Sequence, residues 1–324
     1  MPRLPHCLLA ALVATTALLS GCTDDGASVR ELGGSSGSAS GSGGSSSASG
    51  SSSLAEEDLS STTDDQLVLD GVARYEEYVG RQVEELRADT SVFTDAVRAG
   101  DLRAARSAYA PSRVSWERIE PIAGLVAAID TAVDARVDDF AGATDPDFTG
   151  WHRLEYLLFE RGTTRGAAPF ADRLDAGLAR LDRALDDARI PPAAVPVGAA
   201  ELVEEVSLGK ITGEENRYAK TDLWDFDANL DGSEAAIEAL TPARRTADPE
   251  LLRKVQDDFA ALEATLRPFR RGGGWELYCL ADDEFPSPRC EQVTVDPQTV
   301  ATLQSQLGAL SEDVSLVAGA LGLG

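Results

Sequence analysis

The sequence predicts an all-α fold of antiparallel helices, and three observations support this prediction. Apolar residues recur at three- and four-residue steps over most of the chain after Asp64, which is the period of an amphipathic helix. Capping residues stand directly before several of these periodic segments. No segment shows the alternation of apolar and polar residues that is typical of a strand. We expect the helices to pack as one or two bundles, with two four-helix-bundle-like halves.

The first predicted helix is long, because apolar residues recur at helical spacing from Val72 to Val97 and Gly100 then ends the pattern. Asp101 can cap the next helical segment. Proline has no amide hydrogen and fits poorly inside a helix, so we expect this segment to break at Pro111 and again at Pro121.

A turn-rich stretch then leads into a helix that carries His152 and ends near Gly162, with Thr149 as its expected cap. Two later helices begin with Asp-Pro, at residues 248–249 and 296–297, where the aspartate can cap and the proline suits the first turn. The Asp-Pro helices are expected at about residues 249–269 and 297–321. Four further helical segments are expected at about residues 168–189, 197–211, 214–220 and 232–240.

The start of the chain predicts an export signal followed by a tether. A single cationic residue and a short apolar run are typical of a secretory signal over residues 1–21. The run ends in Leu-Ser-Gly-Cys, which resembles the lipobox of bacterial lipoproteins and predicts lipidation of Cys22. An ordinary signal peptide with a chance cysteine is the alternative. Residues 22–63 are rich in Gly and Ser and behave as a flexible tether, so the helical domain is expected over residues 64–324.

This leader places the protein outside the cytoplasm, lipid-anchored to the cell membrane, in a periplasm or on the outer face of the cytoplasmic membrane. The compartment is oxidising, and two cysteines remain after Cys7 leaves with the leader and Cys22 is lipidated. An even pair in such a compartment favours a disulfide between Cys279 and Cys290. A zinc site built on these cysteines is disfavoured, because two isolated cysteines with no nearby histidine supply only half of the usual ligands.

The charge of the chain is strongly acidic, with 55 Asp and Glu residues against 29 Lys and Arg residues and a formal net charge of −26. Nucleic-acid binding requires clustered cations, so we expect no nucleic-acid partner. The acidity can serve solubility alone, and it also suits cations or basic partners.

The stretch GWHRLEYLLFERG holds His152, which is the only histidine left once the leader with His6 is removed. Residues three apart share a helix face, so His152 and Glu155 can point at one ion. Glu117 and Glu120 have the same spacing. Two helices that each present such a pair can form a metal site in a bundle, although the order familiar from di-iron bundles is Glu-x-x-His. Taken alone, a His-x-x-Glu pair is also common on an ordinary helix surface.

One imidazole among many carboxylates predicts an oxygen-rich site, which suits hard cations such as Fe³⁺, Mn²⁺, Ca²⁺ or Mg²⁺. The only methionine is Met1, so a thioether copper site is excluded. The His-Glu-x-x-His motif of zinc peptidases needs a second histidine that the mature chain lacks. A Ser-His-Asp triad would have to use His152, and no nucleophile-elbow motif accompanies it.

The segment TDLWDFDANLDG alternates aspartates with apolar residues. A calcium loop is conceivable, but the full EF-hand spacing is missing. We expect the apolar residues to pack and the aspartates to cap helices or face solvent, namely Asp222, Asp225, Asp227 and Asp231.

Four motifs together resemble the imelysin-type domain of the EfeO/EfeM iron-uptake proteins: WERIEPIAG, IDTAVDARVDDF, DPDFTGWHRLEYLLFERG and VSLGKITGEENRYAKTDLWDFDANLDGSEAAIEAL. The match covers about residues 67–270. The resemblance implies an extracytoplasmic, imelysin-like helical protein that binds iron, as Fe³⁺ or Fe²⁺ with other divalent cations possible. It also implies two partners, an EfeU-type iron permease and an EfeB-type haem peroxidase.

The resemblance assigns the family's metal-site positions residue by residue. Some EfeO proteins carry an N-terminal cupredoxin domain, but the Gly/Ser tether occupies that place here, so the chain resembles the shorter form. The His-x-x-Glu motif of the family falls on His152 and Glu155, and its acidic positions fall on Glu117, Glu120, Asp134 and Glu215. We expect Glu117, His152, Glu155 and Glu215 to be direct ligands, with Glu120 and Asp134 as further ligands or as groups that support them. Glu120 could instead be a surface residue.

The expected function is a lipid-anchored component that captures iron and passes it to the permease, without catalysing a reaction. One alternative is a metallopeptidase, because imelysin-like domains have been grouped with peptidases. Another is a surface lipoprotein that recognises only a protein partner.

Overall fold

The computed structural model describes residue 59, residues 62–187 and residues 189–323. All of them belong to one compact unit, Ser47–Gly324. Residues 1–58, with the expected signal sequence, Cys22 and most of the tether, lie outside the described residues. Within the described part, no helix combines the length and the hydropathy that crossing a membrane requires.

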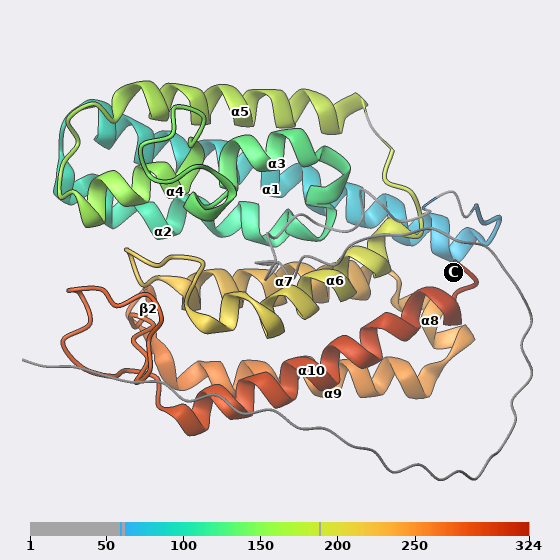
Figure 1. Ribbon diagram of the computed structural model, residues 1–324. Coiled ribbons are helices and arrows are strands. Elements are labelled where there is room, and N and C mark those ends of the chain that lie inside the picture. Colours follow the sequence, from blue (N-terminus) through green and yellow to red (C-terminus); the bar gives the residue numbers. More distant parts are fainter. Residues whose placement is uncertain (1–58, 60–61, 188, 324) are drawn as a thin grey trace, which may run out of the picture. The chain divides into compact units, whose positions relative to one another are not determined.

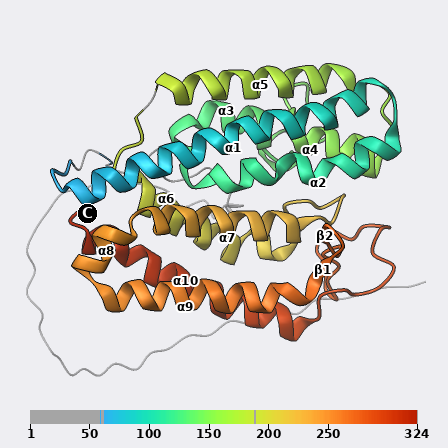
Figure 2. The ribbon, with the colours of Figure 1, turned by 180° about the vertical axis from the view of Figure 1, so that it is seen from behind.

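The described helices form two groups, which lie one above the other in Figures 1 and 2. Contacts between α2 and α7 join the groups. The all-α prediction is confirmed, and the groups correspond to the two expected halves. The first group holds α1 (Gln66–Arg98), α2 (Leu102–Ile119), α3 (Ala127–Asp134), α4 (Gly150–Glu155) and α5 (Ala168–Asp187). The second holds α6 (Ala194–Leu208), α7 (Asp222–Ala239), α8 (Thr241–Ala247), α9 (Pro249–Leu266) and α10 (Pro297–Ala320).

The long helix α1 shows how the apolar pattern builds the core. Asp65 caps it by accepting a hydrogen bond from the amide of Leu67 at 2.8 Å. The predicted stripe is buried against α2 and α5, and Tyr75, Leu86 and Phe93 are fully inaccessible to solvent. Each such side chain contributes about 2 kcal/mol on burial. The same seam of side chains fixes α2 beside α1, which places the polar residues of α2 between the two groups.

Pro111 lies inside α2, so the predicted break at this residue is wrong. An internal proline costs a helix about 3 kcal/mol. Tyr109 and Trp116 on either side of it are fully buried, and α2 packs on both α1 and α7. Tertiary packing therefore outweighs the local cost. The break at Pro121 is confirmed, because α2 ends at Ile119 and a 3₁₀ segment, η2 (Glu120–Val126), follows.

Residues 214–220 form turns, so the helix predicted there is wrong. Left-handed backbone at Gly213 (φ 82°) and Lys220 (φ 55°) bounds this stretch. The short 3₁₀ segment η5 (Lys210–Thr212) precedes it. The next helix, α7, begins ten residues earlier than the predicted 232 because both of its faces are buried, which hides the helical period.

The predicted aspartate caps hold at three helix starts. Asp101, Asp248 and Asp296 accept amide hydrogen bonds at the starts of α2, α9 and α10. Thr149 makes no such bond, so its predicted capping role is wrong. A strand pair absent from the predictions, β1 (Arg270–Arg271) with β2 (Gly274–Trp275), is too short to show alternation. Beyond it, a disulfide joins Cys279 to Cys290 with 5.5 Å between their Cα atoms.

Candidate metal centre

His152 reaches the interior because α4 begins in close contact with the end of α3. The first residue of α4, Gly150, has a φ of 78°. A Cβ atom on it would lie 2.1 Å from the carbonyl oxygen of Val133. Only glycine fits both the backbone conformation and the space. The contact brings His152 against Asp134, which is the residue after Val133 and the last of α3.

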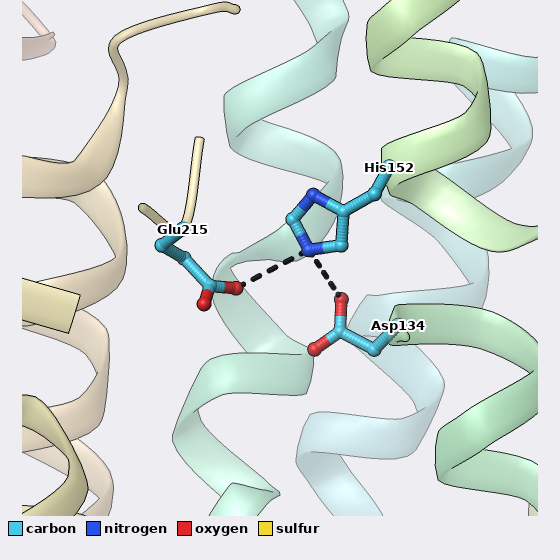
Figure 3. Close-up of side chains that lie close together, drawn as sticks. All are labelled: Asp134, His152 and Glu215. Atoms are coloured by element: carbon cyan, nitrogen blue, oxygen red, sulfur yellow. Dashed lines mark ion pairs between the residues drawn. The ribbon is translucent and has the colours of Figure 1, made fainter. Parts of the chain in front are cut away.

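Three side chains converge around one ring nitrogen, as Figure 3 shows. His152 Nε2 lies 3.4 Å from Asp134 Oδ1 and 3.3 Å from Glu215 Oε1. The ligand atoms of all three residues lie within 4.8 Å of one another. His152 and Glu215 are each 2% exposed. Among the described residues, Nε2 has no partner with hydrogen-bond geometry. One nitrogen and two carboxylates thus face a common point.

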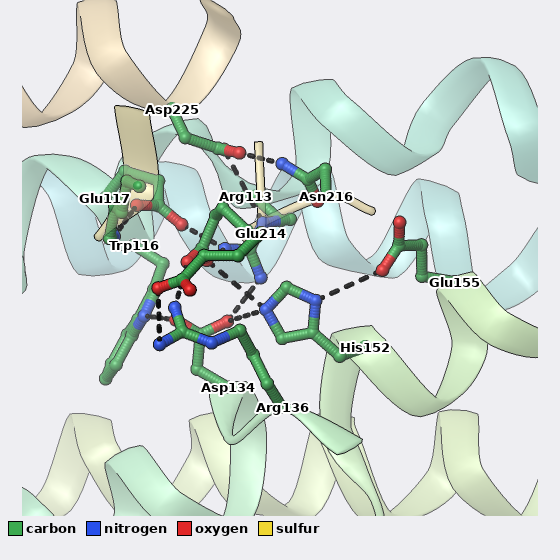
Figure 4. Close-up of polar contacts among 12 residues, drawn as sticks. Arg113, Trp116, Glu117, Asp134, Arg136, His152, Glu155, Glu214, Asn216 and Asp225 are labelled. Carbon is green, nitrogen blue, oxygen red and sulfur yellow. Dashed lines mark hydrogen bonds and ion pairs between the residues drawn. The ribbon is translucent and has the colours of Figure 1, made fainter. Parts of the chain in front are cut away.

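Glu155 lies on the opposite side of the imidazole, as Figure 4 shows. Its Oε2 is 3.2 Å from His152 Nδ1. Its Oε1 accepts hydrogen bonds from the amides of Tyr218 at 2.8 Å and Ala219 at 2.7 Å. The helix changes to a π-helix, η4 (Tyr156–Glu160), directly after it. Glu155 therefore holds the ring so that Nε2 faces the two carboxylates, an arrangement common for histidines that bind metals.

Arg113, from α2, is a cation at the centre of the cluster and is fully buried. Its guanidinium donates to Asp134 and Glu117, and it donates to Glu215 Oε1 at 2.7 Å. Its Nε lies 3.5 Å from Asp225 Oδ1. Buried carboxylates are costly unless they are paired, so this guanidinium permits several of them to share one region.

A second buried cation, Lys210, holds the two remaining predicted glutamates. Its Nζ donates to Glu117 Oε2 at 3.0 Å and to both carboxylate oxygens of Glu120 at 2.8 and 2.7 Å. The side-chain amide of Asn229 also donates to these carboxylates, at 3.0 Å to Glu117 and 2.7 Å to Glu120. Glu117 and Glu120 thus bind protein cations and do not converge with His152.

An acidic cavity of about 320 Å³ borders the converging residues. Asp134 and Glu215 form part of its wall. Arg136 also lines it and donates to Glu215 Oε2 at 2.6 Å. Seven of the ten lining residues are acidic, so the cavity favours cations. These seven are Glu120, Asp130, Asp134, Asp138, Asp139, Glu205 and Glu215.

The carboxylates set the protonation of the centre. Burial lowers the pKa of His152, as does the charge of Arg113, but Asp134, Glu155 and Glu215 outweigh both and raise it to about 10. Burial opposes ionisation of Asp134, yet Arg113 and His152 hold its pKa below the usual range. Without a metal, the imidazole is therefore protonated and paired with ionised carboxylates. A metal ion would take the place of that proton.

Several residues that organise the centre are absent from the predictions made from the sequence. Arg113 precedes Glu117 by four residues on one helix, and this spacing of opposite charges is the one signal that could have found it. The expectation that Asp222 and Asp225 cap or face solvent is wrong, because both are fully buried. Asp225 accepts a hydrogen bond from the side-chain amide of Asn216. Nothing in the local pattern of α7 separates these aspartates from exposed ones.

The fold and the centre define a class of protein: an all-α protein with one buried imidazole, converging carboxylates and an acidic cavity beside them. The family model named Peptidase_M75 and described as imelysin matches residues 71–317. The chain belongs to the imelysin family.

Three relatives carry the name "Iron uptake system component EfeO". The protein from Escherichia coli O157:H7 is 41% identical over 253 residues, which cover 78% of this chain and 64% of the relative. Those from Escherichia coli K12 and Shigella flexneri are 40% identical over the same coverage. The chain thus spans about 64% of the length of these relatives.

Proposed function

We propose that this protein is the iron-binding component of an iron-uptake system, which captures iron outside the cytoplasm and passes it to a membrane permease. The observation that carries the proposal is the convergence of the buried Nε2 of His152 with the carboxylates of Asp134 and Glu215, at 3.4 and 3.3 Å. An imidazole nitrogen with two carboxylate oxygens suits iron, and the names of the relatives point to the same metal.

The proposed ligands are Asp134, His152 and Glu215. Glu155 orients the imidazole through Nδ1, and Glu117 and Glu120 anchor Arg113 and Lys210 beside the ligands. Iron requires a neutral imidazole, so binding releases the proton that His152 holds in the metal-free protein. The cavity attracts the cation and gives it a path to the wall formed by Asp134 and Glu215.

The proposal includes a lipid anchor at Cys22 and delivery to an EfeU-type permease, with an EfeB-type haem peroxidase as a further partner. Support comes from the lipobox-like sequence and from the relatives' description as components of an iron-uptake system. Transfer to a permease requires that iron leave the centre. The cavity supplies an exit along the route by which the cation enters.

The test is a metal titration of the purified protein with Fe²⁺ under anaerobic conditions, Fe³⁺, Mn²⁺, Zn²⁺ and Ca²⁺. Glu215→Gln and Glu214→Gln form a matched pair, because Glu214 is adjacent but contacts Arg136 at 3.3 Å and not His152. Loss of a ligand should weaken iron binding by more than about tenfold, whereas Glu214→Gln should change it much less. If His152→Ala binds iron with unchanged affinity, the proposed site is refuted.

The family model's name keeps a peptidase as the second candidate. Cleavage of mixed peptides that depends on metal and is lost in Glu155→Ala would support it. The chain has only His6 and His152, so a metallopeptidase would have to bind its metal with a single core histidine. A lipoprotein that recognises only a protein partner predicts no rise in melting temperature with metal concentration, whereas iron binding to the native state predicts such a rise.

A further inference from the structure

The turn of residues 215–220 lies between the proposed metal centre and the loop that the disulfide closes, residues 279–290. We call these segments the ligand turn and the disulfide loop. Among the described residues the ligand turn is neither helix nor strand, so no regular ladder of backbone hydrogen bonds holds its shape. One backbone hydrogen bond lies within it, from the amide of Lys220 to the carbonyl oxygen of Asn216 at 2.6 Å. The rest of its conformation depends on contacts with its surroundings.

One side of the ligand turn faces the metal centre. Glu215 supplies a carboxylate beside His152. The amides of Tyr218 and Ala219 hold Glu155, which in turn holds the other nitrogen of the ring. Asn216 accepts a hydrogen bond from the hydroxyl of Tyr109 at 2.7 Å. A shift of this turn would therefore move one proposed ligand and the residue that orients another.

The other side of the ligand turn faces the disulfide loop. Ser287 donates to the carbonyl oxygen of Tyr218 at 3.2 Å, and Arg289 donates to that of Ala219. Tyr218 and Ala219 thus bind Glu155 through their amides and the disulfide loop through their carbonyl groups. The guanidinium of Arg217 lies 4.3 Å from the ring centre of Phe285.

Lys220 ends the ligand turn and depends most on the loop. It is fully buried, and its Nζ is 2.8 Å from Asp283 of the disulfide loop. Its φ of 55° is a backbone conformation that residues other than glycine rarely adopt. Its carbonyl accepts a hydrogen bond from the amide of Tyr278, next to Cys279, at 2.9 Å. A buried ammonium and a left-handed residue both need such external support.

We infer that the disulfide loop positions the proposed metal centre, so that iron affinity depends on the bond between Cys279 and Cys290. The inference rests on the proposed function. A loop closed by a disulfide samples fewer conformations than an open one. The closed loop therefore presents Asp283, Ser287 and Arg289 to the ligand turn together, and opening it releases contacts on both carbonyls and on Lys220.

The first test compares wild-type protein with the double variant Cys279→Ser, Cys290→Ser in titrations with anaerobic Fe²⁺ and with Co²⁺, whose visible absorption reports ligand geometry. We expect the dissociation constant to rise about tenfold or more, as for loss of other groups that orient metal ligands. The Co²⁺ spectrum should change as well. Equal affinity and an equal spectrum in a folded double variant would overturn the inference.

A second pair of variants leaves the disulfide intact and decides the matter if the double variant fails to fold. Asp283→Asn removes the charge that pairs with Lys220. Asp282→Asn removes the same charge from the neighbouring exposed residue, for which the described structure gives no bond to the ligand turn. Weaker binding and a changed Co²⁺ spectrum in Asp283→Asn alone are expected. The same binding in both variants would contradict the inference.

Different results would refute the proposed iron binding and the role of the disulfide loop. Wild-type protein that binds none of Fe²⁺, Fe³⁺ and Co²⁺ refutes the proposed function. Wild-type protein that binds both metals, with unchanged binding in folded loop variants, refutes only the role of the disulfide loop. Hydrogen exchange of the amides of Tyr218 and Ala219 measures directly how firmly the ligand turn is held. In the loop variants we expect these amides to exchange faster even where the global stability is unchanged.

Discussion

The variant Glu155→Gln separates a residue that orients the imidazole from one that binds the metal. Glutamine can keep the side-chain oxygen that accepts from the amides of Tyr218 and Ala219, so the backbone contacts survive. With that oxygen in place, the NH₂ group of glutamine replaces the acceptor Oε2 that lies 3.2 Å from His152 Nδ1, so the variant removes the charge and the hydrogen bond on this side of the ring. A hydrogen bond to a charged group contributes about 1.5–3 kcal/mol, which is the expected loss in stability of the metal-free protein.

The expected loss of iron affinity in Glu155→Gln is roughly 10- to 100-fold, because the ring is held less firmly while all three proposed ligands remain. Isothermal titration with anaerobic Fe²⁺ measures it. Glu160→Gln, an exposed change on the adjoining π-helix, is the matched control and should leave the affinity unchanged. Complete loss of binding would make Glu155 a ligand, and affinity equal to that of the control would remove its orienting role. Either result would refute the reasoning.

Three further variants test the framework of the centre. Gly150→Ala should destabilise the protein by about 2–4 kcal/mol, because its Cβ would overlap the carbonyl of Val133. Gly166→Ala shares the φ of 78° but has open space, so equal losses in urea unfolding would contradict this. Arg113→Met should cost about 3–5 kcal/mol by leaving buried carboxylates unpaired, and an unchanged unfolding midpoint would argue against it. Burial raises the pKa of Asp222 from 3.8 to about 7, more than Lys220 lowers it. The folded state thus binds this proton more tightly, and stability falls as pH rises between these values. Asp222→Asn should remove up to about 4 kcal/mol of that fall, and parallel curves of unfolding free energy against pH for both proteins would disprove it.

The candidate centre was predicted in part. Asp134, His152 and Glu215 were all among the predicted ligands, and the structure brings these three together. Glu117 and Glu120 share a helix face as expected, but that face meets Lys210 instead of His152. Helical spacing predicts which residues lie on the same face of a helix, but it does not predict which residues of other elements that face contacts.

The sequence by itself determined the all-α class, the aspartate caps and the choice of His152 as the one core imidazole. These depend on local periodicity, on short-range hydrogen bonding and on composition. Only the tertiary structure decided which carboxylates meet that imidazole, and how Arg113 and Lys210 neutralise these and their neighbours. The physical reason is that the convergence depends on close approach between distant elements, here α4 on α3 at Gly150 and the ligand turn on both. Burial then makes an unpaired carboxylate costly, and Asp134 and Glu215 become stable beside the guanidinium of Arg113, which lies 21 and 102 residues away in the sequence.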